Sequence, residues 1–321
     1  MTVRGADARA GSRLAVAFGW VAVVPAATAV AARAAGFERG PFALLVALSP
    51  WALVVGAIAL ALAVIGRSAA LGLVAVVTAV PVVLWNAPLW TSVAAPEEDP
   101  ALTVASVSLT FGRADADEVV ALVREHHVDV LAVQELTPEA AEALVAAGLE
   151  AELPHAAAFP EPGFVGTGLW SRSSLADIAS IDGFVSRTVS AQVDTASGPL
   201  TVIAPHPAAP GALSHEAWTS DTEALTTVLT GVEGPALVLG DLNLTRDHAA
   251  FRDLLALGYA DAADQAGSGL TLTFPQGRAP FPLVAIDHAL VREAPLVATA
   301  VTTTAVRGAD HRALVVTYSH G

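Results

Sequence analysis

The chain has 321 residues with no cysteine and no lysine, so disulfides and thiolate metal sites are excluded and every basic side chain is an arginine. The first 100 residues hold six arginines against five acidic residues, and the remainder holds ten arginines against 26 acidic residues, a formal charge of −16. A surface of that sign repels polyphosphate, so the composition disfavours a nucleic acid as the partner of the C-terminal part.

Three uncharged apolar stretches, residues 14–32, 42–65 and 68–90, dominate the N-terminal part. Each reaches the roughly 20 residues that cross a hydrocarbon core, and spanning helices tolerate the prolines that interrupt them. The alternative, a cleaved signal peptide followed by buried core helices, does not explain three such stretches in succession. We expect a membrane region over residues 1–90 with three transmembrane helices. No ionisable residue lies inside them, which favours an anchor over a transport path.

Arginine placement predicts the orientation of these spans. Arg4, Arg9 and Arg13 precede the first span, Arg67 lies between the second and third, and the segment after the third is acidic. Because cytoplasmic loops are enriched in arginine, we expect the N-terminus inside the cell. The sequence therefore predicts a multi-pass protein of the cell membrane, with residues 91–101 as a linker and residues 102–321 as an extracellular domain.

From residue 102 onward, short apolar strands alternate with helical stretches. Asp115 with Glu118 has the spacing of a helix-capping box, and Thr137-Pro138 opens a second helix. Mixed strands and helices in one unit predict an α/β (α+β) domain in which sheets pack together with helices outside. Strands are expected at 102–109, 128–135, 168–171, 200–206, 236–241, 286–291 and 313–318, and helices near 214–230 and 247–257.

Polar side chains recur where the apolar strands end. Asp241 and Asn243 follow one strand and point the same way, because side chains two residues apart share a face of an extended chain. A single aspartate in such a place is usually a turn or cap residue. Their joint occurrence predicts one site, since rigid elements can hold several side chains together; the other members are Glu135, His206, Asp287, Asp310 and His311.

Six segments together resemble the endonuclease/exonuclease/phosphatase superfamily. In chain order they are VQELT (133–137), GTGLWSR (166–172), APHPAAP (204–210), GDLNLTRD (240–247), IDHALV (286–291) and GADHRALVV (308–316). The resemblance implies a four-layer α/β sandwich, two central sheets flanked by helices. With three spans ahead of it, the domain is also similar to a narrower group, the membrane-anchored members associated with teicoplanin antibiotic resistance.

The resemblance implies a metal-dependent active site. Glu135 would be the carboxylate ligand of Mg²⁺, with Mn²⁺ as the alternative ion, and Asp310 would belong to the set that binds the metal or orients water. A hard oxygen donor suits Mg²⁺. Arg172 either binds the substrate phosphate or caps the strand before it.

The remaining matched residues would act on water and phosphate. Asp241 would orient or deprotonate the attacking water, and Asn243 would donate a hydrogen bond to the phosphoryl oxygens. His311 would be the general base or a phosphate-stabilising imidazole, oriented by Asp287. His206 would contact the phosphate from the other side.

One position departs from the family pattern. In the segment SLTFG, Ser108 stands where the pattern N-x-x-F-G has asparagine. Serine is shorter and a poorer metal ligand, so we assign Ser108 to the metal set with a bridging water and expect weaker metal affinity or lost activity. Because the other matches are intact, a working enzyme is favoured.

These observations predict a membrane-anchored, Mg²⁺-dependent phosphohydrolase with its active site on the extracellular face. Its substrate would be a lipid-linked or cell-envelope phosphate ester or pyrophosphate, and its partner the lipid bilayer; no protein partner is expected. The alternatives are a surface nuclease or phosphodiesterase and, because of Ser108, a catalytically weakened protein that binds an envelope component.

Overall fold

The computed structural model describes residues 3–93, 100–211 and 215–321. Contacts divide the chain into two compact units: Met1–Ala87 with Asp247–Ala249, and Pro88–Arg246 with Ala250–Gly321. The predicted linker 91–101 contains residues 94–99, which lie outside the described residues.

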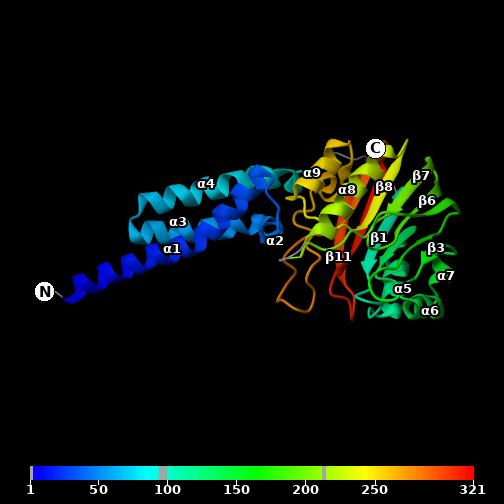
Figure 1. Ribbon diagram of the computed structural model, residues 1–321, viewed down its shortest axis with the longest axis horizontal. Coiled ribbons are helices and arrows are strands. Elements are labelled where there is room, and N and C mark those ends of the chain that lie inside the picture. The colour runs from blue at the N-terminus through cyan, green and yellow to red at the C-terminus, as the bar shows by residue number, and fades with distance from the viewer. Residues whose placement is uncertain (1–2, 94–99, 212–214) are drawn as a thin grey trace. The chain divides into compact units, whose positions relative to one another are not determined.

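The first unit is helical. Its helices are α1 (Val3–Ala35), α2 (Pro41–Ala47), α3 (Ala52–Gly66) and α4 (Ala69–Asn86), with a 3₁₀ turn η1 (Ser49–Trp51) before α3. Figure 1 shows α1, α3 and α4 side by side. Small side chains such as Ala59, Ala63 and Ala75 are buried between them, whereas Val21, Val64 and Leu73 point outward and are exposed. Three segments are long and apolar enough to cross a membrane: Ala10–Ala35, Ser49–Gly66 and Ala69–Trp90.

The expected second span is not one helix. Helix α2 ends at Ala47, and α3 starts only at Ala52 after the 3₁₀ turn that contains Pro50. Proline has no N–H to donate and its ring clashes with the carbonyl four residues earlier, so it kinks or breaks a helix. At Pro50 the helix breaks, whereas α1 and α4 continue through Pro25 and Pro81. The candidate span therefore begins at Ser49 and not at residue 42.

The second unit contains two six-stranded sheets. The first sheet has the order β11-β12-β1-β2-β4-β3 and the second β5-β6-β7-β8-β10-β9. The strands of the first sheet are β11 (Leu296–Ala305), β12 (Arg312–His320), β1 (Leu102–Ser108), β2 (Val130–Gln134), β4 (Thr167–Ser171) and β3 (His155–Phe159). Those of the second are β5 (Leu175–Ile181), β6 (Thr188–Thr195), β7 (Gly198–Ala204), β8 (Ala236–Asp241), β10 (Asp287–Arg292) and β9 (Ala260–Asp261).

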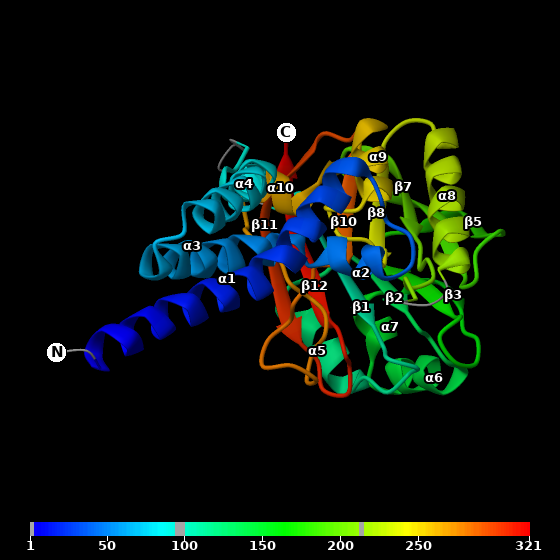
Figure 2. The same cartoon turned by 60° about the vertical axis from the view of Figure 1, so that its left-hand side comes forward.

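The two sheets pack face to face, with helices on their outer sides. Val104 and Ala132 of the first sheet meet Val202 and Leu239 of the second in one buried cluster. The helices on the outer side of the first sheet, whose buried residues form a second cluster with it, are α5 (Ala116–Glu125), α6 (Pro138–Ala146) and α7 (Leu149–Glu152). Those of the second sheet include α8 (Glu216–Gly231) and α9 (Ala249–Ala256), and the short α10 (Ala262–Ala266) follows β9 (Figures 1 and 2). This confirms the predicted four-layer α/β sandwich.

The two predicted helix starts are present, but one capping box is only half formed. The side chains of Asp115 and Thr137 accept the backbone N–H groups of Glu118, at 3.2 Å, and Ala140, at 3.1 Å. The carboxylate of Glu118 does not return to Asp115; it accepts the backbone N–H of Arg307 at 2.7 Å. Glu118 therefore links α5 to the β11–β12 connection by a hydrogen bond.

The connection from β1 to α5 turns in left-handed backbone. Thr110, Phe111 and Gly112 have φ of 52°, 57° and 73° in succession. A Cβ atom on Gly112 would lie 2.5 Å from Thr137 Oγ1, the cap of α6. Only glycine combines this φ with such a close approach, so the loop is fixed against the start of α6.

We expect Gly112→Ala to lower the thermal unfolding temperature of the full-length protein in detergent micelles. The control is Gly163→Ala, because Gly163 has a φ of 79° and nothing within 4 Å of the added Cβ. In the control, the added Cβ destabilises the fold only through the unfavourable φ. The additional loss of unfolding free energy in Gly112→Ala should be about 1–3 kcal/mol, because the Cβ also overpacks the contact with Thr137. Equal unfolding temperatures for the two variants would contradict the close packing at Thr137.

Candidate active site

Three titratable side chains meet where the two sheets end. Asp241, the last residue of β8, lies directly opposite Asp287, the first residue of β10, in an antiparallel pair. His311 immediately precedes β12 of the other sheet. Its Nδ1 lies 2.9 Å from Asp287 Oδ2 and its Nε2 lies 3.7 Å from Asp241 Oδ2. The three side chains are buried, so the predicted partnership of Asp287 with His311 is present in the geometry.

Electrostatics assign different states to these groups. Burial alone would lower the pKa of His311, but Asp287 and Asp241 outweigh it and raise that pKa to about 10. The imidazole is therefore protonated at neutral pH and donates Nδ1–H to Asp287. Burial raises the pKa of Asp241, and the neighbouring Asp287 adds to this while His311 opposes it. Asp241 is thus a stronger base than an exposed aspartate.

His206 also lies close to Asp241. It follows β7, is buried, and places Nε2 3.8 Å from Asp241 Oδ2. Burial lowers the pKa of His206 to about 4, and the positive charge on His311 acts in the same direction. His206 is therefore a neutral imidazole at physiological pH, next to a charged one.

Asn243 is held in a strained turn. Its φ is 47°, its backbone N–H donates to Asp241 Oδ1 at 2.9 Å, and its Nδ2 donates to the carbonyl of Pro207, also at 2.9 Å. The indole Nε1 of Trp218 donates to the Asn243 carbonyl at 3.1 Å. An amide nitrogen has two donors, so the second N–H of Asn243 remains available to a phosphoryl oxygen.

Glu135 and Asp310 form a second acidic group close to His311. Burial raises the pKa of Glu135, the hydrogen bond from Phe111 opposes this, and the nearby charges of Asp310 and His311 contribute with opposite signs. Phe111 N–H donates to Glu135 Oε2 at 2.6 Å. The Thr110 hydroxyl donates to Asp310 Oδ1 at 2.6 Å, and Arg278 lies 3.1 Å from Asp310 Oδ2. The loop after β1 therefore holds both carboxylates.

The residues on this side fit a hard divalent cation. Ser108 ends β1 beside the end of β2 that leads to Glu135, and its buried Oγ has no hydrogen-bond partner in the described chain. Carboxylate and hydroxyl oxygens suit Mg²⁺ or Mn²⁺. Asp241, Asp287 and His311 also lie close enough together to bind a metal. A protonated imidazole has no free lone pair, however, which favours Glu135 as the ligand.

Arg172 lies away from these groups. Its Nε is 3.2 Å from Asp129 Oδ1 and its Nη2 donates to the Val128 carbonyl at 2.9 Å. Asp129 precedes β2 and Glu135 follows it, so the two ends are roughly 20 Å apart along the strand. The geometry favours the strand-capping alternative for Arg172 over phosphate binding.

Several residues that hold the site were not anticipated from the sequence. They are Thr110, Phe111, Trp218, Arg278 and Phe274, whose ring centroid lies 4.8 Å from that of His311. Most act through a backbone group or a contact distant in sequence. One signal could have been read from the sequence. In the segment TFG at 110–112, Gly112 comes shortly after the expected end of a strand, where a glycine indicates a tight turn.

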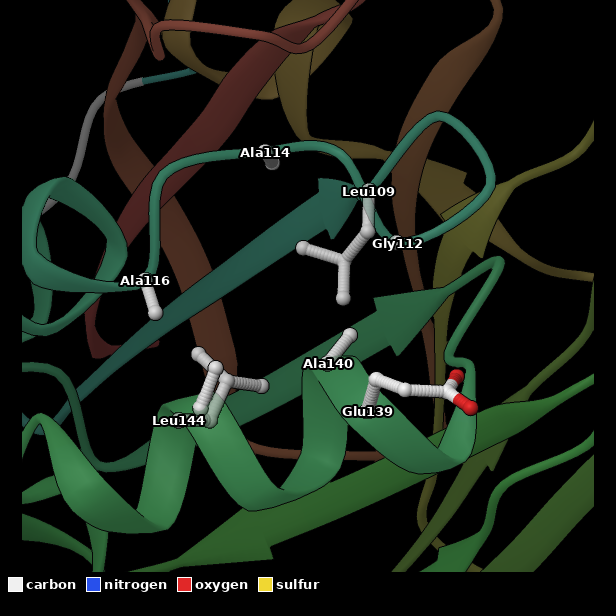
Figure 3. Close-up of a pocket in the computed structure, with 8 residues that line it drawn as sticks. Leu109, Gly112, Ala114, Ala116, Glu139, Ala140 and Leu144 are labelled. Atoms are coloured by element: carbon white, nitrogen blue, oxygen red, sulfur yellow. The ribbon is translucent and has the colours of Figure 1, made fainter.

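A separate small pocket lies behind the loop after β1 and is not part of this site. Figure 3 shows Leu109 and Ala140 pointing into it, with the loop on one side and α6 on the other. Its lining is Leu109, Gly112, Ala114, Ala116, Glu139, Ala140, Ala143 and Leu144. None of these residues belongs to the cluster around Asp241, and the pocket is a gap in the outer helical layer.

Replacement of Asp287 by asparagine should lower the pKa of His311, because the neutral amide removes the closest negative charge. The measurement is NMR of the full-length protein in micelles with ¹³C at the histidine Cε1, assigned with His311→Ala. We expect the His311 midpoint near pH 10 to move down by about one to three pH units. Asp194→Asn on the exposed part of β6 is the control. An unchanged midpoint in Asp287→Asn would contradict the ion pair.

Comparison with solved structures places the second unit in a known fold. The 3'-5' exonuclease NExo from Neisseria meningitidis is 19% identical with a TM-score of 0.54, covering 68% of this chain and 99% of that one. An AP endonuclease from Archaeoglobus fulgidus is 18% identical with a TM-score of 0.55, covering 67% and 98%. An endonuclease/exonuclease/phosphatase from Beutenbergia cavernae is 18% identical with a TM-score of 0.51, covering 70% and 72%. At these identities the likeness concerns the fold alone. No curated protein matches the chain in sequence.

The family model of the Endonuclease/Exonuclease/phosphatase family matches residues 107–311. The match begins in β1, ends at His311, and includes every residue that the sequence assigned to the site. It covers more than half of the chain. The chain therefore belongs to the Endonuclease/Exonuclease/phosphatase family.

Proposed function

We propose that the chain is a membrane-anchored phosphohydrolase that depends on a divalent cation, Mg²⁺ or Mn²⁺, and acts on a phosphate ester or pyrophosphate linked to a lipid or another envelope component. The observation that carries the proposal is the buried cluster of Asp241, Asp287 and His311 next to Glu135. It combines a base, a fixed positive charge and a carboxylate for a cation, which are the groups that phosphoryl transfer to water requires.

The protonation states divide the work between Asp241 and His311. Asp241 in its ionised form accepts the proton of the attacking water at Oδ2, and the water oxygen then bonds to phosphorus as the ester oxygen leaves. His311, protonated and held by Asp287, donates Nε2–H to a phosphoryl oxygen, where negative charge grows. The raised pKa of His311 thus supports the phosphate-stabilising role over that of general base. Asn243 would add the second N–H of its amide.

Glu135 would hold the cation, with Asp310 and Ser108 beside it. A bound Mg²⁺ would neutralise charge on the phosphate. Asp310 is already shared by Thr110 and Arg278, so its contribution would be through water or orientation.

Location and substrate class rest on the first unit and on charge. Three helices are long and apolar enough to cross a membrane, and the arginines before the first of them support an extracellular catalytic unit. The formal charge of −16 over residues 101–321 favours a lipid or envelope phosphate over DNA. The same arrangement supports the similarity to membrane-anchored members associated with teicoplanin resistance.

A nuclease or phosphodiesterase is the second candidate. It is favoured by the relatives, since solved structures with this fold include the 3' phosphatase NExo bound to a product DNA hairpin and D. rerio TDP2 complexed with a single-strand DNA product. Release of phosphate from a lipid diphosphate and cleavage of plasmid or oligonucleotide DNA, each with and without Mg²⁺, separate the two.

In the phosphate-release assay we expect Asp241→Asn and His311→Ala to lower kcat by about 10²–10⁴-fold, because one removes the base and the other the positive charge. Asp194→Asn and His155→Ala, two exposed positions, are the matched controls and should keep wild-type rates. If both site variants retain wild-type activity, the catalytic proposal fails and the binding alternative gains.

Ser108→Asn should strengthen cation binding, because the longer amide can reach the cation with its own oxygen. Calorimetric titration of the full-length protein with Mg²⁺ and with Mn²⁺ measures this without turnover, and we expect a lower Kd for the variant. Ser173→Asn, at an exposed serine, is the control. An identical Kd for wild type and Ser108→Asn would show that residue 108 has no part in cation binding.

A further inference from the structure

An exposed aromatic pair lies beside the predicted cation ligand. Phe111 and Phe164 are 51% and 40% exposed, and their ring centroids are 6.2 Å apart in an edge-to-face arrangement with an interplanar angle of 86°. Such large apolar side chains are usually buried. Both come from loops of the catalytic unit, and neither ring packs into the core of the sandwich.

The backbone attaches both rings to the segment that carries Glu135. The N–H of Phe111 donates to Glu135 Oε2 at 2.6 Å. The loop that contains Phe164 is hydrogen-bonded to Leu136, the residue after Glu135, on both sides of Phe164. Glu161 N–H donates to the Leu136 carbonyl at 3.0 Å, and Leu136 N–H donates to the Gly166 carbonyl at 2.9 Å. The backbone that carries both rings is thus held next to the segment of Glu135.

We infer that Phe111 and Phe164 bind the apolar chain of the phosphate substrate, an alkyl or isoprenoid group whose first carbons follow the phosphate. This inference rests on the proposed function, which puts the phosphate at Glu135 and His311. The substituent of a phosphate held there would extend toward the surface, and this pair is an exposed apolar surface whose backbone is bonded to Glu135 and Leu136. Burial of apolar carbons against the rings would add affinity in proportion to the area removed from water.

The arrangement of the rings favours an aliphatic chain over a nucleobase. A nucleobase stacks on a free aromatic face. The guanidinium of Arg113 lies over the ring of Phe111, 5.5 Å from its centroid, and Phe164 stands edge-to-face with the same ring. The acidic surface of residues 101–321 adds a penalty for a polyanion, whereas a single phosphate on an uncharged chain carries no such extended charge.

The test compares straight-chain alkyl phosphates from methyl to hexyl with the full-length protein in micelles. For the wild type we expect kcat/KM to rise by roughly two- to fourfold for each added methylene over the first few carbons. Phe111→Ala and Phe164→Ala should each lower the hexyl-to-methyl ratio of kcat/KM by about tenfold, mainly through KM. Phe111→Leu should keep most of the ratio, because leucine is apolar. All of these changes retain the backbone N–H that binds Glu135.

The matched control is Ile178→Ala, which removes an apolar side chain that is 46% exposed on the edge strand β5; it should leave the ratio unchanged. Binding of hexylphosphonate and methylphosphonate, followed by calorimetry, tests the pair without turnover. If no alkyl phosphate is hydrolysed but the phosphonate preference depends on Phe111, the proposed function fails while the apolar subsite stands. An unchanged ratio in both alanine variants overturns the inference. So does a loss of oligonucleotide binding in these variants with no loss of alkyl preference.

Discussion

The burial of two carboxylates against one imidazole is the constraint on which the candidate site of the second unit depends. Removing a charge from water costs several kcal/mol even after the protein relaxes, and Asp241 and Asp287 are both buried. His311 compensates Asp287 through a 2.9 Å contact. Asp241 lies farther from the imidazole, at 3.7 Å, so the positive charge of His311 does not outweigh the effect of burial, which raises the pKa of Asp241. The basicity that the proposed reaction uses is therefore a consequence of incomplete charge compensation.

Backbone strain marks the same region. Glu135, Asn243 and Thr110 all have positive φ without being glycine, and such conformations cost of order 1–3 kcal/mol each. Each is held by a specific hydrogen bond: the Phe111 N–H on Glu135, the Trp218 indole on Asn243, and the pairing of Thr110 with Asp310. Strained loops fixed in this way present side chains already oriented for a substrate, which lowers the cost of ordering them on binding.

The sequence predicted the centre of the fold better than its edges. The strands expected from apolar runs correspond to β1, β2, β4, β12, β7, β8 and β10, which lie inside the sheets, and a strand covered on both faces reads as a continuous apolar stretch. The edge strands β11, β3, β5 and β9 were not anticipated, and neither was β6. Edge strands have solvent on one side and in part carry small or polar side chains, such as TTTA at 302–305, so they lack that signal.

For the site, the sequence predicted the functional side chains but not the contacts that hold them in place. Strand-end residues such as Asp241, Asp287 and His311 were identified because a polar residue at either end of an apolar run can be recognised from the sequence alone. The contacts that hold them, such as Arg278 on Asp310 or Trp218 on the Asn243 carbonyl, join residues far apart in the chain. In the first unit, composition identified apolar spans but not the helix break at Pro50, since proline is compatible with both a kink and an end.

The direct pairing of Asp241 with Asp287 across β8 and β10 has a consequence for how this protein can diverge. The separation of the two carboxylates is set by the pairing register of β8 and β10. A shift of that register by one residue would turn one carboxylate to the opposite face of the sheet. Residues 250–272, which lie between the strands beyond Asn243 and before Phe274, do not enter that register. Insertions and deletions there can remodel what surrounds the site while the chemistry keeps its spacing, whereas a single indel within either strand would abolish it.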